Sequence, residues 1–120
     1  MSRPSPGANV CVVTGTLVHP PELRTLASGR TLANLEVRVA TPGSPAETVP
    51  VACEDPGPAV VALAPGAELA VRGRVRRRFF RAGGRTQSRT EVLAEAIVPL
   101  RQATRARRLL AEAAARLGAP

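Results

Sequence analysis

The stretch RGRVRRRFFRAGGRTQSRT, residues 72–90, sets the architecture of the chain because apolar and basic residues alternate up to a Gly83-Gly84 turn. The alternation predicts a strand with one buried face, Leu69, Val71, Gly73 and Val75, and one arginine face, Arg72, Arg74, Arg76 and Arg78. The same alternation places Phe80 on the arginine face and Phe79 on the buried face. It does not assign Arg77 to the arginine face, and the position of Arg77 stays open. After the turn, a second strand has the inner face Val92, Ala94, Ala96 and Val98, and it ends at Pro99. These residues therefore predict a β-hairpin.

The net charge of the protein is concentrated in this hairpin. The chain has 17 basic residues, all arginine, and nine acidic residues, which gives a net charge of +8. Residues 72–90 hold eight arginines and no acid, so the other nine arginines balance all nine carboxylates. Such a field steers polyanions, and a ring beside a flexible turn suits a sequence-tolerant binder of single-stranded nucleic acid. The alternative is a solvated charged edge that discourages sheet-to-sheet pairing.

Three strands are predicted before the hairpin. Residues 9–17 form an apolar, β-branched run in which Gly15 lies where the strand must bend. Residues 22–30 form a loop with a short extended piece and a turn at Ser28-Gly29. A second strand, residues 34–40, and a third, residues 49–53, each bury one face formed by the odd-numbered residues. Pro50 leaves one side of the third strand unpaired.

Two helices are predicted. In residues 55–66 an acidic cap, an early proline and a Pro-Gly stop frame about two helical turns. Residues 101–117 form an amphipathic helix whose apolar stripe is Ala103, Ala106, Leu110, Ala113, Ala114 and Leu117. A stripe this rich in alanine suits packing on the same domain or on a twin subunit. We assign Leu110, Ala114 and Leu117 to a subunit contact.

The order of these elements is that of a five-stranded OB barrel, a Greek-key fold whose exposed face and loops bind oligonucleotides. The predicted fold is mainly all-β, with an OB-fold barrel in residues 9–100 and a short helix between the third and fourth strands. Residues 1–8 are a disordered leader, and residues 101–120 add the C-terminal amphipathic helix. Because the sequence shows neither a secretory signal nor a long apolar run, we expect a cytoplasmic, nucleoid-associated protein without a membrane contact.

The sequence shows no pattern typical of an enzyme. The adjacent Glu54 and Asp55 are explained by helix capping, and His19 is a lone histidine before two prolines. Cys11 and Cys53 lack metal-binding spacing and are interpreted as buried free thiols. We therefore expect no catalytic residues, no metal and no cofactor.

Several short motifs resemble the bacterial single-stranded DNA-binding protein family. They are a first strand ending in Gly15-Thr16-Leu17, then Pro21-Glu22-Leu23-Arg24, Ser28-Gly29 and Ala33-Asn34, and in the hairpin VRGRVR, residues 71–76, and Thr90-Glu91-Val92. The resemblance covers residues 9–100. It implies an OB fold that binds single-stranded DNA in replication, repair or recombination as a homo-oligomer, a dimer or a tetramer.

The chain departs from this family in its aromatic residues and its C-terminal sequence. The family places tryptophans at positions matching Thr48, Glu54 and Phe80, and only Phe80 is a ring here. Since each lost stack removes about 1–3 kcal/mol, affinity would depend mainly on phosphate contacts. The family's acidic tail tip is also missing from the final residues, RLGAP. The chain also resembles a sister family, the primosomal replication protein N group, which is likewise short and relatively poor in stacking rings. Members of that family work as dimers and support replication restart, and they usually lack a C-terminal helix like this one.

These observations predict sequence-independent binding of single-stranded DNA by arginine-phosphate contacts with limited stacking, and the pattern leaves RNA open. The predicted surface comprises Arg72, Arg74, Arg76, Arg78, Phe80, Arg81, Arg85 and Arg89, with Arg24, Arg30 and Arg38 extending it. Replication or repair proteins are the expected further partners. The alternative is an OB-fold protein-interaction module, or a primosomal-type restart factor that binds DNA weakly.

Overall fold

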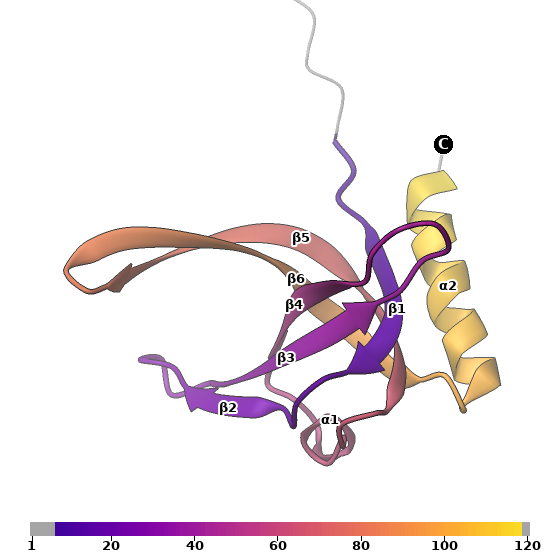
Figure 1. The fold of residues 1–120 in the computed structure, drawn as a ribbon, viewed down its shortest axis with the longest axis horizontal. Coiled ribbons are helices and arrows are strands. Elements are labelled where there is room, and N and C mark those ends of the chain that lie inside the picture. The colour runs from indigo at the N-terminus through magenta and orange to yellow at the C-terminus, as the bar shows by residue number, and fades with distance from the viewer. Residues whose placement is uncertain (1–6, 119–120) are drawn as a thin grey trace, which may run out of the picture.

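The computed structural model describes residues 7–118, so residues 1–6 of the predicted leader, residues 1–8, lie outside the described residues. Within residues 7–118 the chain forms six strands and two helices (Figure 1). In order they are β1 (Cys11–Leu17), β2 (Glu22–Thr25), β3 (Thr31–Val39), β4 (Glu47–Glu54), α1 (Pro58–Val61), β5 (Glu68–Ala82), β6 (Arg85–Pro99) and α2 (Ala103–Gly118). The chain is mostly β-structure, as predicted, and no helix in the described part is long and apolar enough to cross a membrane.

The strands form one sheet that closes on itself. The spatial order of the strands is β1-β5-β6-β4-β3-β2. A further pairing between β1 and β3 closes the sheet. This closure makes a barrel-like sheet of five strands, and β2 pairs with residues 31–34 at the start of β3. Gly15 lies where β1 turns from β5 towards β3, and a Cβ there would meet the Arg38 carbonyl oxygen at 2.3 Å. The predicted bend at Gly15 is confirmed, and it depends on this close approach of two backbones.

The inner faces of the strands fill the barrel. The buried cluster comprises Leu17, Ala33, Leu35, Val37, Val51, Leu69, Val71 and Val92. Full burial of a Leu or Val side chain is worth about 1.5–3 kcal/mol, so these residues supply much of the driving force for closure. The predicted alternation is confirmed in β3, where Leu35 and Val37 are buried and Arg38 is exposed. In β4, the parallel pairing with β6 begins at Val51, directly after Pro50.

The β5–β6 hairpin extends well beyond the barrel (Figure 1). Because β5 pairs with β1 only as far as Gly73, and β6 pairs with β4 only from Val92, residues 74–91 pair with one another; we call them the arm. No core lies opposite the arm, so Val75 and Phe79 are exposed instead of buried as predicted. Their parity is as expected, but the alternation could not indicate where the barrel ends.

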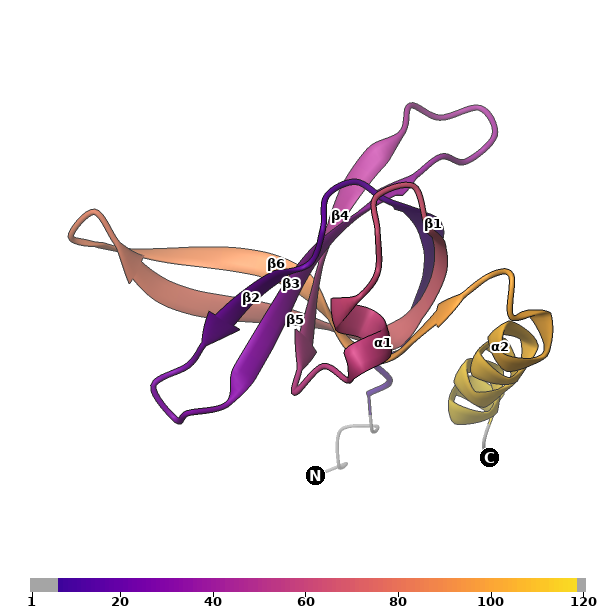
Figure 2. The ribbon, with the colours of Figure 1, turned by 90° about the horizontal axis from the view of Figure 1, so that it is seen from below.

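Helix α2 packs on the outer face of β5 and β6 (Figure 2). Its buried residues are Ala106, Leu109 and Ala113. Ala106 and Leu109 pack with Ala70 and Val98 in a second small core. Leu109 was missed by the prediction, whereas Leu110 and Leu117 are 45% and 61% exposed. Small residues on both surfaces allow a close approach, so the buried stripe is narrow. The three residues of the predicted subunit contact, Leu110, Ala114 and Leu117, therefore remain on the exposed side of α2.

The helix also changes the surroundings of Arg72. The prediction placed this side chain on the exposed face of β5, but α2 covers that position and leaves the residue 8% exposed. Its guanidinium contacts the Glu112 carboxylate of α2, and its Nε lies 4.0 Å from Glu95. Glu95 is the unmatched residue of a bulge in β6 opposite Arg72 and Gly73, and it also contacts Arg116 of α2. Arg72 therefore attaches the helix to the sheet and is not part of the free basic surface.

The short helix α1 differs from its prediction in length and in capping. It has four residues instead of two turns, and its N-cap is Gly57, which makes no side-chain capping bond. Asp55 does not cap the helix. Instead it adopts a positive φ of 48° and binds Arg30, which lies in the turn before β3.

Candidate nucleic-acid interface

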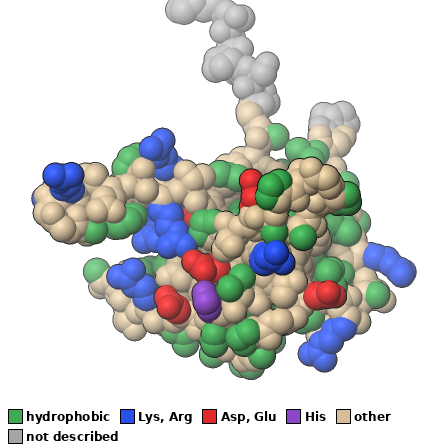
Figure 3. All heavy atoms as spheres, viewed as in Figure 1, with side chains coloured by type: hydrophobic (Ala, Val, Ile, Leu, Met, Phe, Trp, Pro, Cys, Tyr) green, Lys and Arg blue, Asp and Glu red, His purple; other side chains and the backbone are tan. Residues whose placement is uncertain are grey.

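A groove lies between the arm and the β2–β3 side of the barrel, and we call it the arm groove. It has a volume of about 330 Å³ and is lined by His19, Pro20, Glu22, Arg24, Asn34, Glu36, Arg78 and Arg89. The space-filling view shows basic side chains gathered in the hollow below the arm (Figure 3). Residues from four strands meet here because barrel closure brings β2 and β3 opposite β5 and β6.

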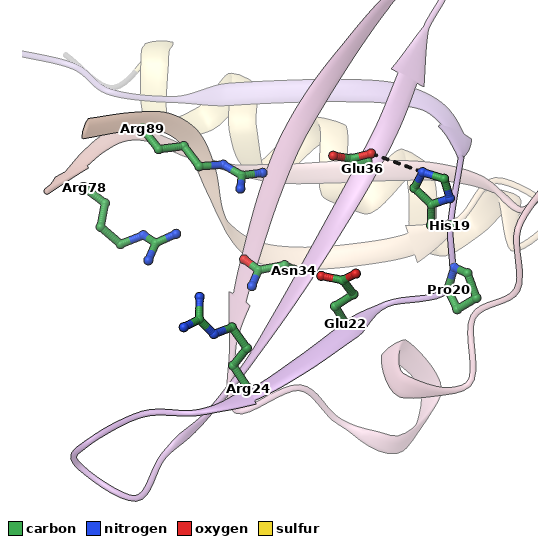
Figure 4. A pocket seen from close by; sticks show the side chains of 8 residues that line it. All are labelled: His19, Pro20, Glu22, Arg24, Asn34, Glu36, Arg78 and Arg89. Atoms are coloured by element: carbon green, nitrogen blue, oxygen red, sulfur yellow. Dashed lines mark ion pairs between the residues drawn. The ribbon is translucent and has the colours of Figure 1, made fainter. Parts of the chain in front are cut away.

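The arm groove has a basic end and an acidic end (Figure 4). Arg24 of β2, Arg78 of β5 and Arg89 of β6 point towards one region, with Asn34 beside them. Glu22, Glu36 and His19 lie at the other end, where the His19 Nε2 is 3.5 Å from a Glu36 carboxylate oxygen. Three guanidinium groups from three strands are a suitable arrangement for one or two phosphate groups.

A buried carboxylate orders the arginines of the arm. The Glu91 side chain is 1% exposed and lies among Arg76, Arg78 and Arg89. The Arg76 Nε donates to it at 2.9 Å, the Arg78 Nη2 at 3.4 Å, and the Arg89 Nε is 3.8 Å away. Arg76 also binds Glu54 of β4 at 3.2 Å. The Arg78 Nε is buried and has no acceptor among the described residues.

The two phenylalanines lie on opposite faces of the arm. Phe80 is partly buried, and the Arg78 guanidinium carbon is 5.4 Å from its ring centroid. Phe79 is 65% exposed, and the guanidinium of Arg77 lies 5.7 Å from its ring centroid. Both contacts fit cation–π geometry. Phe80 therefore shares a face with Arg78, as the alternation predicts, and Arg77, which had no predicted place, lies on the other face with Phe79.

The remaining predicted arginines do not join the arm groove. Arg81 and Arg85 lie at the tip of the arm and Arg74 near its base, all exposed and without an ion pair among the described residues. Arg38 is exposed and lines a separate hollow with Glu68. Of the predicted residues, the structure brings together Arg24, Arg78 and Arg89, with Arg76 beside them through Glu91.

Arg30 does not line the arm groove and instead forms ion pairs with two acidic residues. Its Nη2 donates to the Asp55 carboxylate at 2.6 Å, and its Nη1 lies 3.2 Å from Glu54. The hydrogen bond from Arg30 lowers the pKa of Asp55 and raises the pKa of Arg30 itself. Because Glu54 also binds Arg76, this acid links Arg30 and Arg76 in one ion-pair network. Arg30 is thus partly neutralised within the protein.

Sequence reasoning missed the residues that limit the charge of the arm groove. The alternation of β3 places Asn34 and Glu36 on the outer face, but only barrel closure shows that this face is opposite the arm. Glu91 follows the acid-free stretch directly, and a cross-strand pairing of Glu91 with Arg76 could have been inferred from a hairpin with its turn at Gly83-Gly84.

Cys11 and Cys53 are free thiols at the edge of the barrel core, and both are half-buried instead of fully buried as predicted. Burial raises the pKa of each thiol. Within residues 7–118, no group of three or more His, Cys, Asp or Glu side chains is arranged to hold a metal ion. Neither a protein-family model nor a curated protein matches the chain.

Proposed function

We propose that the chain is an OB-fold protein that binds single-stranded DNA without sequence preference, with phosphates held at the basic end of the arm groove. The observation that carries this proposal is the convergence of Arg24, Arg78 and Arg89 from three strands on one open groove. Single-strand binders combine a basic groove for the backbone with rings on which bases stack, and Phe80 lies on the same face of the arm as Arg78.

The strand connections support the OB assignment. The five strands that close the sheet follow the order β1, β3, β4, β5 and β6, with α1 between the third and the fourth. All pairings are antiparallel except that of β4 with β6. In OB folds the face formed by the second and third strands, together with neighbouring loops, binds oligonucleotides. Here those strands are β3 and β4, and β3 contributes Asn34 to the arm groove.

The test is the salt dependence of binding to labelled oligo-dT, measured by fluorescence anisotropy. The logarithm of the association constant should fall with the logarithm of salt concentration, with a slope of about −0.7 for each phosphate contact. The triple variant Arg24→Ala, Arg78→Ala, Arg89→Ala should bind more weakly and reduce the slope by about 2 units.

The matched control removes the same charge elsewhere, by Arg101→Ala in the turn before α2 together with Arg105→Ala and Arg107→Ala at the start of α2. Equal losses in the two triple variants would show that only net charge matters and would overturn the site. Competition with duplex DNA and single-stranded RNA then ranks the nucleic acids, since arginine-phosphate contacts alone do not distinguish the sugar.

A protein-interaction module, or a restart factor with weak DNA binding, is the second candidate. It is favoured by the acids that neutralise Arg72, Arg76, Arg78 and Arg89 within the chain. Absence of oligo-dT binding at low salt would select this candidate. In either role we place the protein in the cytoplasm beside chromosomal DNA, with replication or repair proteins as partners.

We also propose a homo-oligomer, a dimer or a tetramer, in which the exposed side of α2 contacts a second copy. Leu110 and Leu117 are large apolar residues left uncovered on this helix, and Ala114 lies between them. Sedimentation analysis of the protein and of its Leu110→Arg variant tests the contact. A monomeric wild-type protein would contradict it.

A further inference from the structure

We propose that a second groove, on the α1 side of the barrel, binds a short acidic and apolar peptide segment of a partner protein. This α1 groove has a volume of about 440 Å³, which lies in the usual range of about 300–1,000 Å³ for ligand sites. It is formed by α1 and the turn that follows, the end of β6 and the start of α2. In Figure 2 the chain at the end of β6 runs from beside α1 towards α2. It shares no lining residue with the arm groove.

The floor of the α1 groove is apolar. Leu63, Ala67 and Ile97 line it, and the same residues pack with their other sides against the barrel core. Val60 of α1 and Pro99 at the end of β6 add apolar walls, and all five residues are only partly buried. Covering this surface with a leucine-sized side chain would remove more apolar area from water, which is favourable.

The rim of the α1 groove is basic. Arg101 and Arg105 line it, and neither has an ion pair among the described residues. Within residues 7–118, Arg105 donates a side-chain hydrogen bond only to Gln102, and Arg101 forms no ion pair with Glu68, although both line an adjoining hollow. Two guanidinium groups beside an apolar slot complement an apolar side chain flanked by carboxylates.

The same chemistry disfavours nucleic acid as the occupant. The lining of the α1 groove contains no aromatic ring on which a base could stack. Phosphates would meet the arginines of the rim but leave the apolar floor uncovered. An acidic and apolar peptide satisfies both parts of the groove, so this site goes beyond the proposed function and does not depend on it.

The experiment probes the full chain with arrays of short peptides in which two adjacent apolar residues are flanked by Asp or Glu. Matched arrays carry Lys in place of the acids, or Ser in place of the apolar residues. We expect binding to members of the first array and at least about tenfold weaker binding to both matched arrays. Absence of this preference would overturn the proposal.

Two variants locate the binding. Arg105→Glu should weaken binding of the selected peptide at least about tenfold, while Arg107→Glu, an equal charge change at an exposed position of the same helix, should alter it by less than about twofold. Ala62→Trp tests the slot, because Ala62 is exposed and lines the groove, so the larger side chain should block it without entering the core.

The proposal fails if Arg105→Glu and Arg107→Glu have equal effects, or if the Ala62→Trp variant binds the peptide as well as wild type does. It also fails if oligo-dT displaces the peptide by competing for Arg105, because the groove would then belong to the nucleic-acid surface. Failure of oligo-dT binding in the earlier salt titration leaves the peptide result unaffected, so the two proposals are tested separately.

Discussion

Arg76 and Glu91 face each other across the hairpin, and the Arg76 Nε donates a hydrogen bond to the Glu91 carboxylate at 2.9 Å. The carboxylate is buried, yet two other arginines around it, Arg78 and Arg89, line the arm groove. One acid thus holds several guanidinium groups in fixed positions and cancels part of their charge. If the arm groove binds phosphates as proposed, we expect its affinity to depend on this balance.

Replacing Glu91 with glutamine should strengthen oligo-dT binding at low salt. Glutamine keeps the shape of the side chain but removes the charge, so Arg78 and Arg89 become available to phosphate, and the salt slope should steepen by about 0.7 for each arginine released. The free energy of unfolding should fall by about 1–3 kcal/mol, because arginine donors lose a charged acceptor. Anisotropy titrations and urea denaturation measure the two effects.

The control for this substitution is Glu47→Gln, which makes the same charge change at an exposed position at the start of β4. If both variants change the salt slope equally, Glu91 acts only through net charge and has no ordering role.

Phe80→Leu should weaken oligo-dT binding by about 1–3 kcal/mol, the usual contribution of a base stacked on a ring. Phe79→Leu is the matched control because the neighbouring ring lies on the opposite face of the arm with Arg77. Calorimetric or anisotropy titration distinguishes them. A larger effect of Phe79→Leu would place the bound strand on the other face and exclude the arm groove.

Glu112→Ala should loosen helix α2 without unfolding the barrel. The substitution removes the acid that contacts the buried guanidinium of Arg72, which leaves Glu95 as its remaining acidic neighbour. The cost should be about 1–3 kcal/mol, and hydrogen exchange should accelerate in residues 103–118 while β3 stays protected. Arg107→Ala, on the exposed side of the helix, should leave the exchange pattern unchanged. Uniform acceleration throughout the barrel would contradict a local attachment.

Gly15→Ala should destabilise the closed sheet by about 1–3 kcal/mol, because the new methyl group would collide with the Arg38 backbone. Thermal or urea unfolding measures the change. Gly7→Ala is the control, since a Cβ there meets nothing within 4 Å, and it should change stability by less than about 0.5 kcal/mol. Equal stability of the two variants would show that β1 and β3 are not so closely packed.

The free energy of unfolding should decrease at alkaline pH because of the two thiols. Burial raises the pKa of Cys11 and Cys53 above the ordinary value of 9.0, so the stability they contribute is complete below that value and is lost as pH rises through the folded-state pKa. The sequence has no lysine or tyrosine that would titrate in the same range. Unfolding at about pH 8 and about pH 10 should therefore differ less in a Cys11→Ala, Cys53→Ala variant than in wild type.

The strands of the barrel and the hairpin turn were predictable because alternation along one strand directly reports which side chains share a face. What covers each face was not predictable from the same pattern. Arg72 has the parity of Arg74, yet α2 covers only the first, and Phe79 has the parity of Val71, yet the core ends before it. The excess positive charge of residues 72–90 is visible in the sequence because these residues are contiguous. Glu54, Glu95 and Glu112 are distant from Arg72 or Arg76 in the sequence and contact them only in the folded chain.

If the arm groove binds a polyanion as proposed, the length of the arm should separate the capture of the polyanion from its retention. Arg81 and Arg85 lie at the tip, away from the acids that surround the groove, and the field of exposed charges extends about 10 Å at 0.1 M salt. An approaching strand would therefore meet the tip before the groove, and substitutions at the tip would mainly slow association. The arginines at the base, ordered by Glu91, would instead set the rate of release. In the proposed reaction, the association and dissociation rate constants would therefore depend on different parts of a single hairpin.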